Sequence, residues 1–312
     1  IMIWVYPRRI MKRFLLKVSV FLIGLVMFDF MVGMCCRYLV NHAKGGDTGL
    51  NNYICHKMTE EFLIFGSSRG MHHYDPSIIT DSLNMSCWNC AKDGNGIILM
   101  YGRYHMLSAR YVPKVLVYDV CPEFDLFEGD NHKYLGGLRY YYDEPGVDSI
   151  FWAVDKKERA KMLSSCYRYN SQWLQLISDN IHPLQSDDKG YRPMDKQMTY
   201  VPEKRQDSEE PQYKYDALKF HYLERLIEEC NQHGTKLVFA ISPSFGADDD
   251  RGYNPLKELC ARYDIPLINH FCDPEFTSST EYFYDSVHLN RTGATKYTKK
   301  LMGELKELLG QE

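Results

Sequence analysis

The stretch Lys114-Val-Leu-Val-Tyr-Asp-Val120 follows Pro113 and is the clearest strand pattern in the chain. A short apolar run of this kind, rich in valine and without strict alternation, is typical of a strand buried on both faces. Comparable short runs lie further out, at residues 62–65, 85–91, 236–241 and 265–269. Helical patterns separate these runs. The sequence therefore predicts an α/β fold, a three-layer α/β/α sandwich with a mainly parallel sheet.

Start signals and periodicity place the helices between the strands. Asp75 and Pro76 predict a helix start, because Asp caps free N–H groups and Pro fits the first turn. Other helices are expected to end near residue 109 and to occupy residues 214–232, 254–263 and 292–309. The alternation breaks at about residues 123–213, which we interpret as an insertion or lid with a helix at 155–177 and a loop at 178–212. The sequence predicts one domain, residues 60–312, after a polar linker at residues 41–59.

An apolar segment precedes the linker. Residues 14–36 are 23 residues interrupted only by Lys17 and Asp29, enough at about 1.5 Å per residue to cross a ~30 Å hydrocarbon layer. Four basic residues come before it: Arg8, Arg9, Lys12 and Arg13. The positive-inside tendency then predicts that residues 1–40 form a cytoplasmic tail and membrane anchor, with the domain outside the cytoplasm, in the periplasm or at the cell surface.

Two alternatives stay open for this segment. A cleaved signal peptide would need a shorter apolar core and a small-x-small cleavage site, which residues 32–35 fit poorly. Asp29 is costly within a membrane, so we expect it either to face a partner helix or to lie near the outer end, within reach of water.

The composition excludes some classes of protein. The chain has 37 Lys and Arg against 41 Asp and Glu, a net charge of −4, which excludes a mainly electrostatic nucleic-acid binder. Ten cysteines among 312 residues are too few for a disulfide scaffold. Cys87 and Cys90 have redox-motif spacing, although buried thiols or one local disulfide fit them better. The adjacent His72 and His73 would point in different directions, and no metal or other cofactor is expected.

Three residues could together form a serine nucleophile system. Ser68 follows the first predicted strand after Gly66, which permits a tight turn at the carboxyl edge of the sheet. Asp285 and His288 lie just before the last predicted helix. An Asp three residues before a His can bend back to bond its imidazole and leave the other ring nitrogen free as a base. These residue types provide a nucleophile, a base and an orienting carboxylate.

In order and placement these motifs resemble the SGNH/GDSL-type hydrolases. The resemblance implies that Ser68 is the nucleophile, with a Ser at position 67 where the family has Asp, and that Asp285 and His288 complete the triad. Residues 89–94, Asn-Cys-Ala-Lys-Asp-Gly, resemble the family's second block and imply an oxyanion hole formed by the backbone N–H groups of Ser68 and Gly94. The third block departs from the family, because residues 117–123 lack its Asn donor.

Two further residues are candidate substrate contacts. Asn89 opens the second block, and Arg69 could hold an anionic substrate group through its guanidinium, or form a surface salt bridge instead. Three consecutive tyrosines at residues 140–142 could stack on sugar rings or pack a lid.

The Gly-Ser-Ser-Arg variant together with an N-terminal anchor is similar to the envelope branch of this superfamily, which includes alginate O-acetylation proteins and the D-alanyl-lipoteichoic-acid protein. This resemblance implies a membrane-anchored serine esterase or O-acyltransferase for acyl esters of cell-envelope glycans, without a cofactor. Its expected partners are an acylated carbohydrate or small ester, the membrane, and a membrane protein that delivers acyl groups. The alternative is an inactive binding subunit of an envelope-polysaccharide assembly, which the missing Asn favours.

Overall fold

The computed structural model describes residues 5–183, 189–202 and 212–310. Its centre is a parallel sheet with the strand order β2-β1-β3-β4-β5. The strands are β1 (Phe62–Gly66), β2 (Cys87–Asn89), β3 (Val115–Asp119), β4 (Lys236–Ile241) and β5 (Leu267–Asn269). Strand β1 lies between β2 and β3, and Gly66 is paired with Asp119 at the carboxyl ends of their strands. This is the strand order of doubly wound α/β folds, in which ligands bind at that edge where the order reverses.

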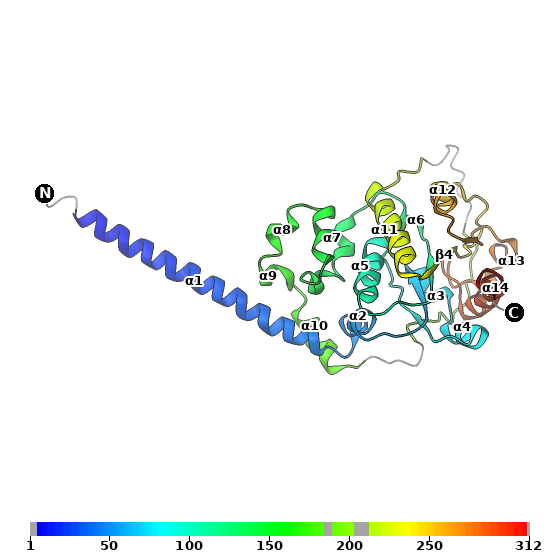
Figure 1. The fold of residues 1–312 in the computed structure, drawn as a ribbon, viewed down its shortest axis with the longest axis horizontal. Coiled ribbons are helices and arrows are strands. Elements are labelled where there is room, and N and C mark those ends of the chain that lie inside the picture. The colour runs from blue at the N-terminus through cyan, green and yellow to red at the C-terminus, as the bar shows by residue number, and fades with distance from the viewer. Residues whose placement is uncertain (1–4, 184–188, 203–211, 311–312) are drawn as a thin grey trace.

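Helices cover both faces of the sheet (Figure 1). Leu63 and Phe65 belong to one core, which is covered by α2 (Gly46–His56), α5 (Ile97–Ser108), α11 (Ala217–His233) and α12 (Asn254–Tyr263). Phe62 and Ile64 point the opposite way, into a core covered by α4 (Pro76–Leu83) and α14 (Arg291–Leu309). The predicted α/β class, parallel sheet and two covered faces are confirmed.

The predicted strands and most predicted helices also occur where expected. The patterns at 236–241 and 254–263 coincide with β4 and α12, and Asp75 caps α4 by accepting a hydrogen bond from the backbone N–H of Ser77 at 2.9 Å. Strand β2 is shorter than the predicted 85–91 because it is an edge strand with β1 as its neighbour.

The predicted polar linker at residues 41–59 is wrong. Most of it forms α2, whose Leu50, Ile54 and Cys55 are buried in the core beside α5. Its polar side chains bond within the protein: Asn51 accepts from the guanidinium of Arg103 at 2.6 and 2.9 Å. A polar composition does not make this segment exposed, because its polar groups find hydrogen-bond partners in the interior.

The insertion is helical, but the single helix predicted at 155–177 is wrong. That stretch breaks into α8 (Glu158–Lys161), α9 (Ser165–Arg168) and α10 (Trp173–Ile181). Ser164 caps α9, and Ser171 has a φ of +61°, which an α-helix cannot continue through. The remaining short helices are α3 (Ser68–His73), α6 (Pro122–Asp125), α7 (Val147–Val154), α13 (Pro274–Thr277), η1 (Asn131–Leu135), η2 (Arg139–Tyr141), η3 (Arg251–Tyr253) and η4 (Thr280–Tyr282). Part of the loop predicted at 178–212 lies outside the described residues.

The N-terminal apolar segment is one long helix, α1 (Val5–His42), that projects from the domain (Figure 1). Its residues Arg9–His42 are long and apolar enough to cross a membrane. Asp29 does not extend into open space: its carboxylate accepts hydrogen bonds from the backbone N–H groups of Ser165 and Cys166 at 2.8 Å and from the Ser164 hydroxyl at 2.7 Å. The partner of Asp29 is therefore the start of α9 in the same chain, and not water at the outer end of the segment.

Candidate active site

Ser68 lies at the turn between β1 and α3. Gly66 ends β1 with a φ of +144°, and a Cβ atom built there would come within 2.7 Å of the Asp119 carbonyl oxygen. Only glycine avoids both the backbone strain and this contact. Ser67 occupies the N-cap position of α3, so Ser68 is the first residue of a helix that starts at the carboxyl edge of the sheet. Ser68 as a residue is half-buried.

His288 and Asp285 reach the same place from the loop before α14. Ser68 Oγ lies 2.8 Å from His288 Nε2, although the two residues are 220 positions apart in the sequence. Both carboxylate oxygens of Asp285 lie 3.0 Å from Nδ1 of His288. The backbone N–H groups of Val287 and His288 donate to the same carboxylate at 2.8 Å. The structure thus brings together the three residues that the sequence singled out.

This geometry fixes the hydrogen positions on the imidazole. A carboxylate only accepts hydrogen bonds, so Nδ1 of His288 carries a hydrogen and Nε2 is left to accept the one from Ser68. Burial alone would raise the pKa of Asp285, but the hydrogen bonds from His288 and the backbone outweigh burial and lower that pKa to about 2. Asp285 is therefore ionised at neutral pH and can stabilise an imidazolium at His288.

A second histidine supports the loop that carries His288. His73 is buried; its Nε2 accepts the backbone N–H of Leu289 at 2.9 Å, and its Nδ1 lies 2.8 Å from Ser242 Oγ. Burial, reinforced by the nearby His288 and Arg69, lowers the pKa of His73 well below its usual value, so its imidazole is neutral. Sequence reasoning assigned His73 no role, and the only signal was a second His five residues after Ser68.

Asp119 occupies the carboxyl end of β3. It is buried and accepts hydrogen bonds from the Tyr74 hydroxyl at 2.7 Å and from the backbone N–H of Ser242 at 2.9 Å. Burial raises the pKa of Asp119, and Arg69, whose Nε lies 3.6 Å away, partly offsets this. Asp119 therefore joins the ends of β3 and β4 and offers the surface no amide donor.

Arg69 does not lie where a substrate contact would have to be. Its side chain is 2% exposed, and its guanidinium donates to the Val120 carbonyl at 2.5 Å and to the Tyr253 hydroxyl at 3.0 Å. Successive residues of a helix point about 100° apart, so the turn that presents Ser68 directs Arg69 inward. The predicted substrate contact is therefore wrong, and so is the alternative of a surface salt bridge, because Arg69 pairs with Asp119 in the interior.

Asn89 is also structural. It is fully buried, and its side chain donates to the carbonyls of Gly70 at 2.8 Å and Tyr74 at 3.2 Å while accepting the N–H of Ala91 at 3.1 Å. These bonds hold α3 against the turn that follows β2. The predicted contact of Asn89 with substrate is therefore wrong, because every one of these atoms faces the backbone of the protein.

The turn that carries Gly94 lies beside the triad. The Lys92 N–H donates to the Gly66 carbonyl at 3.1 Å, and Gly94 has a φ of +65°. Asp93 lies 3.1 Å from Nε2 of His72, whose ring packs edge-on against His288 with 5.5 Å between centroids. The hydrogen bond from His72 lowers the pKa of Asp93. Strand β1, α3 and this turn are therefore tied together at one edge of the sheet.

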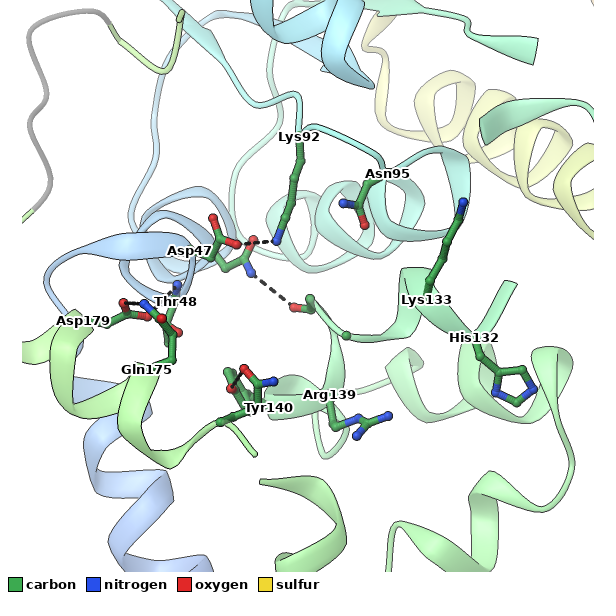
Figure 2. Close-up of a pocket in the computed structure, with 14 residues that line it drawn as sticks. Asp47, Thr48, Lys92, Asn95, His132, Lys133, Arg139, Tyr140, Gln175 and Asp179 are labelled. Carbon is green, nitrogen blue, oxygen red and sulfur yellow. Dashed lines mark hydrogen bonds and ion pairs between the residues drawn. The ribbon is translucent and has the colours of Figure 1, made fainter. Parts of the chain in front are cut away.

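A polar cavity of about 410 Å³ adjoins the same turn (Figure 2). Lys92 extends over it and pairs with Asp47 of α2 at 2.8 Å, while α10 and the insertion form the other walls. Of the three tyrosines, Tyr140 lines the cavity but stacks on Tyr169, with 5.5 Å between ring centroids. The other two pack the insertion through bonds to Asn52 and Trp152.

Two other groups of residues are candidates for redox or metal chemistry, and neither favours it. Cys87 and Cys90 are free buried thiols, and burial raises the pKa of each well above its usual value, which makes thiolate chemistry unfavourable. His132, Asp155 and Glu158 bring their ligand atoms within 4.8 Å of one another. Lys161 already pairs with both carboxylates, at 3.4 and 2.7 Å, so an ammonium group occupies the place of a cation there.

Comparison with known proteins adds no relative. No protein-family model matches the sequence, and no curated protein matches it either.

Proposed function

We propose that the protein is a serine esterase or O-acyltransferase of SGNH type. The observation that carries this proposal is the unbroken chain of contacts from Ser68 Oγ through His288 to Asp285, with 2.8 and 3.0 Å between the bonded atoms. These are hydrogen-bond distances, and they hold the hydroxyl of a half-buried serine next to a base that a carboxylate orients.

The mechanism follows from these contacts. Ser68 Oγ attacks an ester carbonyl while Nε2 of His288 takes its proton, and the carboxylate of Asp285 stabilises the imidazolium. Collapse of the tetrahedral intermediate breaks the ester bond; the leaving oxygen receives the proton from His288, and the acyl group stays on Ser68. An acceptor, water or a sugar hydroxyl, then gives its proton to His288 and takes the acyl group, which restores Ser68.

The backbone is proposed to stabilise the oxyanion. The first N–H groups of a helix have no partner within it, and Ser68 is the first residue of α3. Gly94, in the turn bonded to Gly66, is the second proposed donor. With Asp119 in place of an Asn donor, the site lacks a third, and loss of one such donor costs ~10²–10³ in rate. This observation favours the second candidate, an inactive binding subunit of an envelope-polysaccharide assembly.

The proposed substrates are acyl esters of cell-envelope glycans. Helix α1 would anchor the domain, with its basic N-terminal flank in the cytoplasm and the domain outside. The polar cavity next to the turn of Gly94 has room and hydrogen-bonding groups for an acceptor sugar, and Lys92 of that turn lines it. A membrane partner would supply acyl groups for transfer.

Acylation of Ser68 tests the proposal directly. The full-length protein in detergent micelles is incubated with an activated acetyl ester or a fluorophosphonate, and its intact mass is measured beside Ser68→Ala, His288→Ala and, as control, Ser149→Ala on the exposed side of the insertion. We expect an adduct on the parent and the control and none on the two site variants. The same mass gain in all four proteins, or none in any of them, would argue against an activated serine at Ser68 and leave the binding subunit as the better explanation.

A further inference from the structure

Helix α1 and the insertion are joined at two successive turns of α1. The Asp29 carboxylate accepts three hydrogen bonds from residues 164–166 and so caps α9. One turn later, a Cβ atom built on Gly33 would lie 2.3 Å from Ser165 Oγ, so glycine permits the close approach of α9. The insertion therefore reaches down alongside α1 to the level of Asp29, well inside the apolar segment.

The insertion exposes large apolar side chains just before α9 and at the start of α10. We define the insertion tip as Leu163, Trp173 and Leu174, which are 83%, 54% and 63% exposed. Between the tip and α1 runs an apolar groove of about 540 Å³, with walls that include Phe28, Met31, Cys35, Tyr169, Trp173 and Ile177. The groove is thus continuous with the exposed apolar surface of α1.

We infer that the insertion tip is embedded in the outer leaflet of the membrane and that lipid acyl chains fill the groove. This rests on the proposal that α1 spans a membrane. Large apolar side chains that are more than half exposed are unfavourable in water, and each is stabilised by burial in hydrocarbon. Tryptophan is moreover enriched at the interface between lipid and water.

Charge distribution favours lipid over a protein partner. The sole charged residue of α10, Asp179, is 2% exposed and turned into the protein, where it accepts a hydrogen bond from Gln175 at 2.7 Å. The exposed side of α10 continues the tip with Ile177 and Ile181 and offers a protein partner no charge to recognise. Because the groove shares its walls with α1, whatever surrounds α1 has direct access to it.

Brominated lipids test this contact, because bromine on acyl chains quenches tryptophan only at short range. The full-length protein, with Trp4→Phe as background, is reconstituted into nanodiscs made with ordinary or brominated phosphatidylcholine. We expect bromine to remove part of the emission, most strongly when it lies near the headgroup end of the chains. That quenched part should disappear in Trp173→Phe and persist in the matched control Trp88→Phe.

The outcomes separate the inference from the anchor on which it rests. If the protein does not enter nanodiscs and is released from membranes by carbonate, the anchor itself is refuted. If it enters but Trp173→Phe leaves the quenching unchanged, the tip is not in lipid. A Trp173 emission that is blue-shifted yet insensitive to bromine would mean that a second protein helix covers the groove, which also overturns the inference.

Discussion

Asp285 is proposed to act on His288 through its negative charge. Its pKa of about 2 means that it is ionised at neutral pH. We expect Asp285→Asn to lower kcat for an activated acetyl ester by ~10²–10⁴, because a neutral amide neither fixes the tautomer nor stabilises the imidazolium. Steady-state kinetics beside Asp81→Asn, an exposed carboxylate on α4, measure this. An unchanged kcat would remove Asp285 from the mechanism.

His73 should make folding stability depend on pH in a defined direction. The pKa of His73 is lowered in the folded protein, so below about pH 6.5 the unfolded chain binds a proton that the folded one does not. His73 therefore supports stability above that pH and loses this contribution as the pH falls, by up to about 1.4 kcal/mol per pH unit. Urea unfolding at pH 5.0 and 7.5 should show a smaller difference for His73→Gln than for the parent.

The exposed His221 on α11 provides the control for this comparison. His221→Gln should keep the pH dependence of the parent. A positioning role for His73 predicts in addition that His73→Gln lowers kcat and leaves KM nearly unchanged, because the loop carrying His288 would shift while the surface that meets the substrate would not. If His73→Gln keeps both the parent's pH slope and its kcat, His73 is only a packing residue.

At the scale of elements, the turn from β1 to α3 decides whether Ser68 is presented at all. We expect Gly66→Ala to destabilise the protein by about 1–3 kcal/mol, because φ at +144° is strained for alanine and its methyl group would meet the Asp119 carbonyl. Thermal or urea unfolding measures the loss. Gly129→Ala, where an added Cβ atom meets nothing within 4 Å, should change stability little. Equal stability of the two variants would show that the turn relaxes freely.

The elements that could be predicted are those whose hydrophobic pattern is recognisable without knowing which elements they contact. Strands β1, β3 and β4 are buried on both faces, so their sequences are continuous apolar runs. Helix α2 was missed because Asn51 and its polar neighbours find partners on distant elements, as Asn51 does with Arg103. The breaks between α8, α9 and α10 come from single residues such as Ser171, which leave no periodic trace.

Some residues of the candidate site could be predicted from the sequence and others could not. Ser68, Asp285 and His288 could be predicted because each has a fixed relation to a strand or helix end. Arg69 and Asn89 were misassigned because a polar residue beside a nucleophile has the same sequence signature whether it points outward or into the core. The direction of a side chain depends on the turn that precedes it, and for Arg69 that turn is set by Gly66 and α3.

At the scale of the whole molecule, α1 and the domain are coupled at Asp29 and Gly33. We expect Gly33→Leu to force α9 away from α1, because even a Cβ atom would collide with Ser165. The Asp29 carboxylate would then lose the backbone N–H groups of Ser165 and Cys166. Hydrogen exchange of the peptide around residues 162–170, measured on the protein in nanodiscs, should accelerate.

Gly24→Leu is the matched control for this coupling. It makes the same change on the same helix, at a position where an added Cβ atom meets nothing within 4 Å, so exchange around residues 162–170 should stay at the parent's rate. Acylation of Ser68 by a soluble ester should survive in both variants, because the contacts of the triad involve no residue of α1. Equal exchange in Gly33→Leu and Gly24→Leu would mean that α9 does not rest on α1 in the membrane, and that the domain turns freely on its anchor.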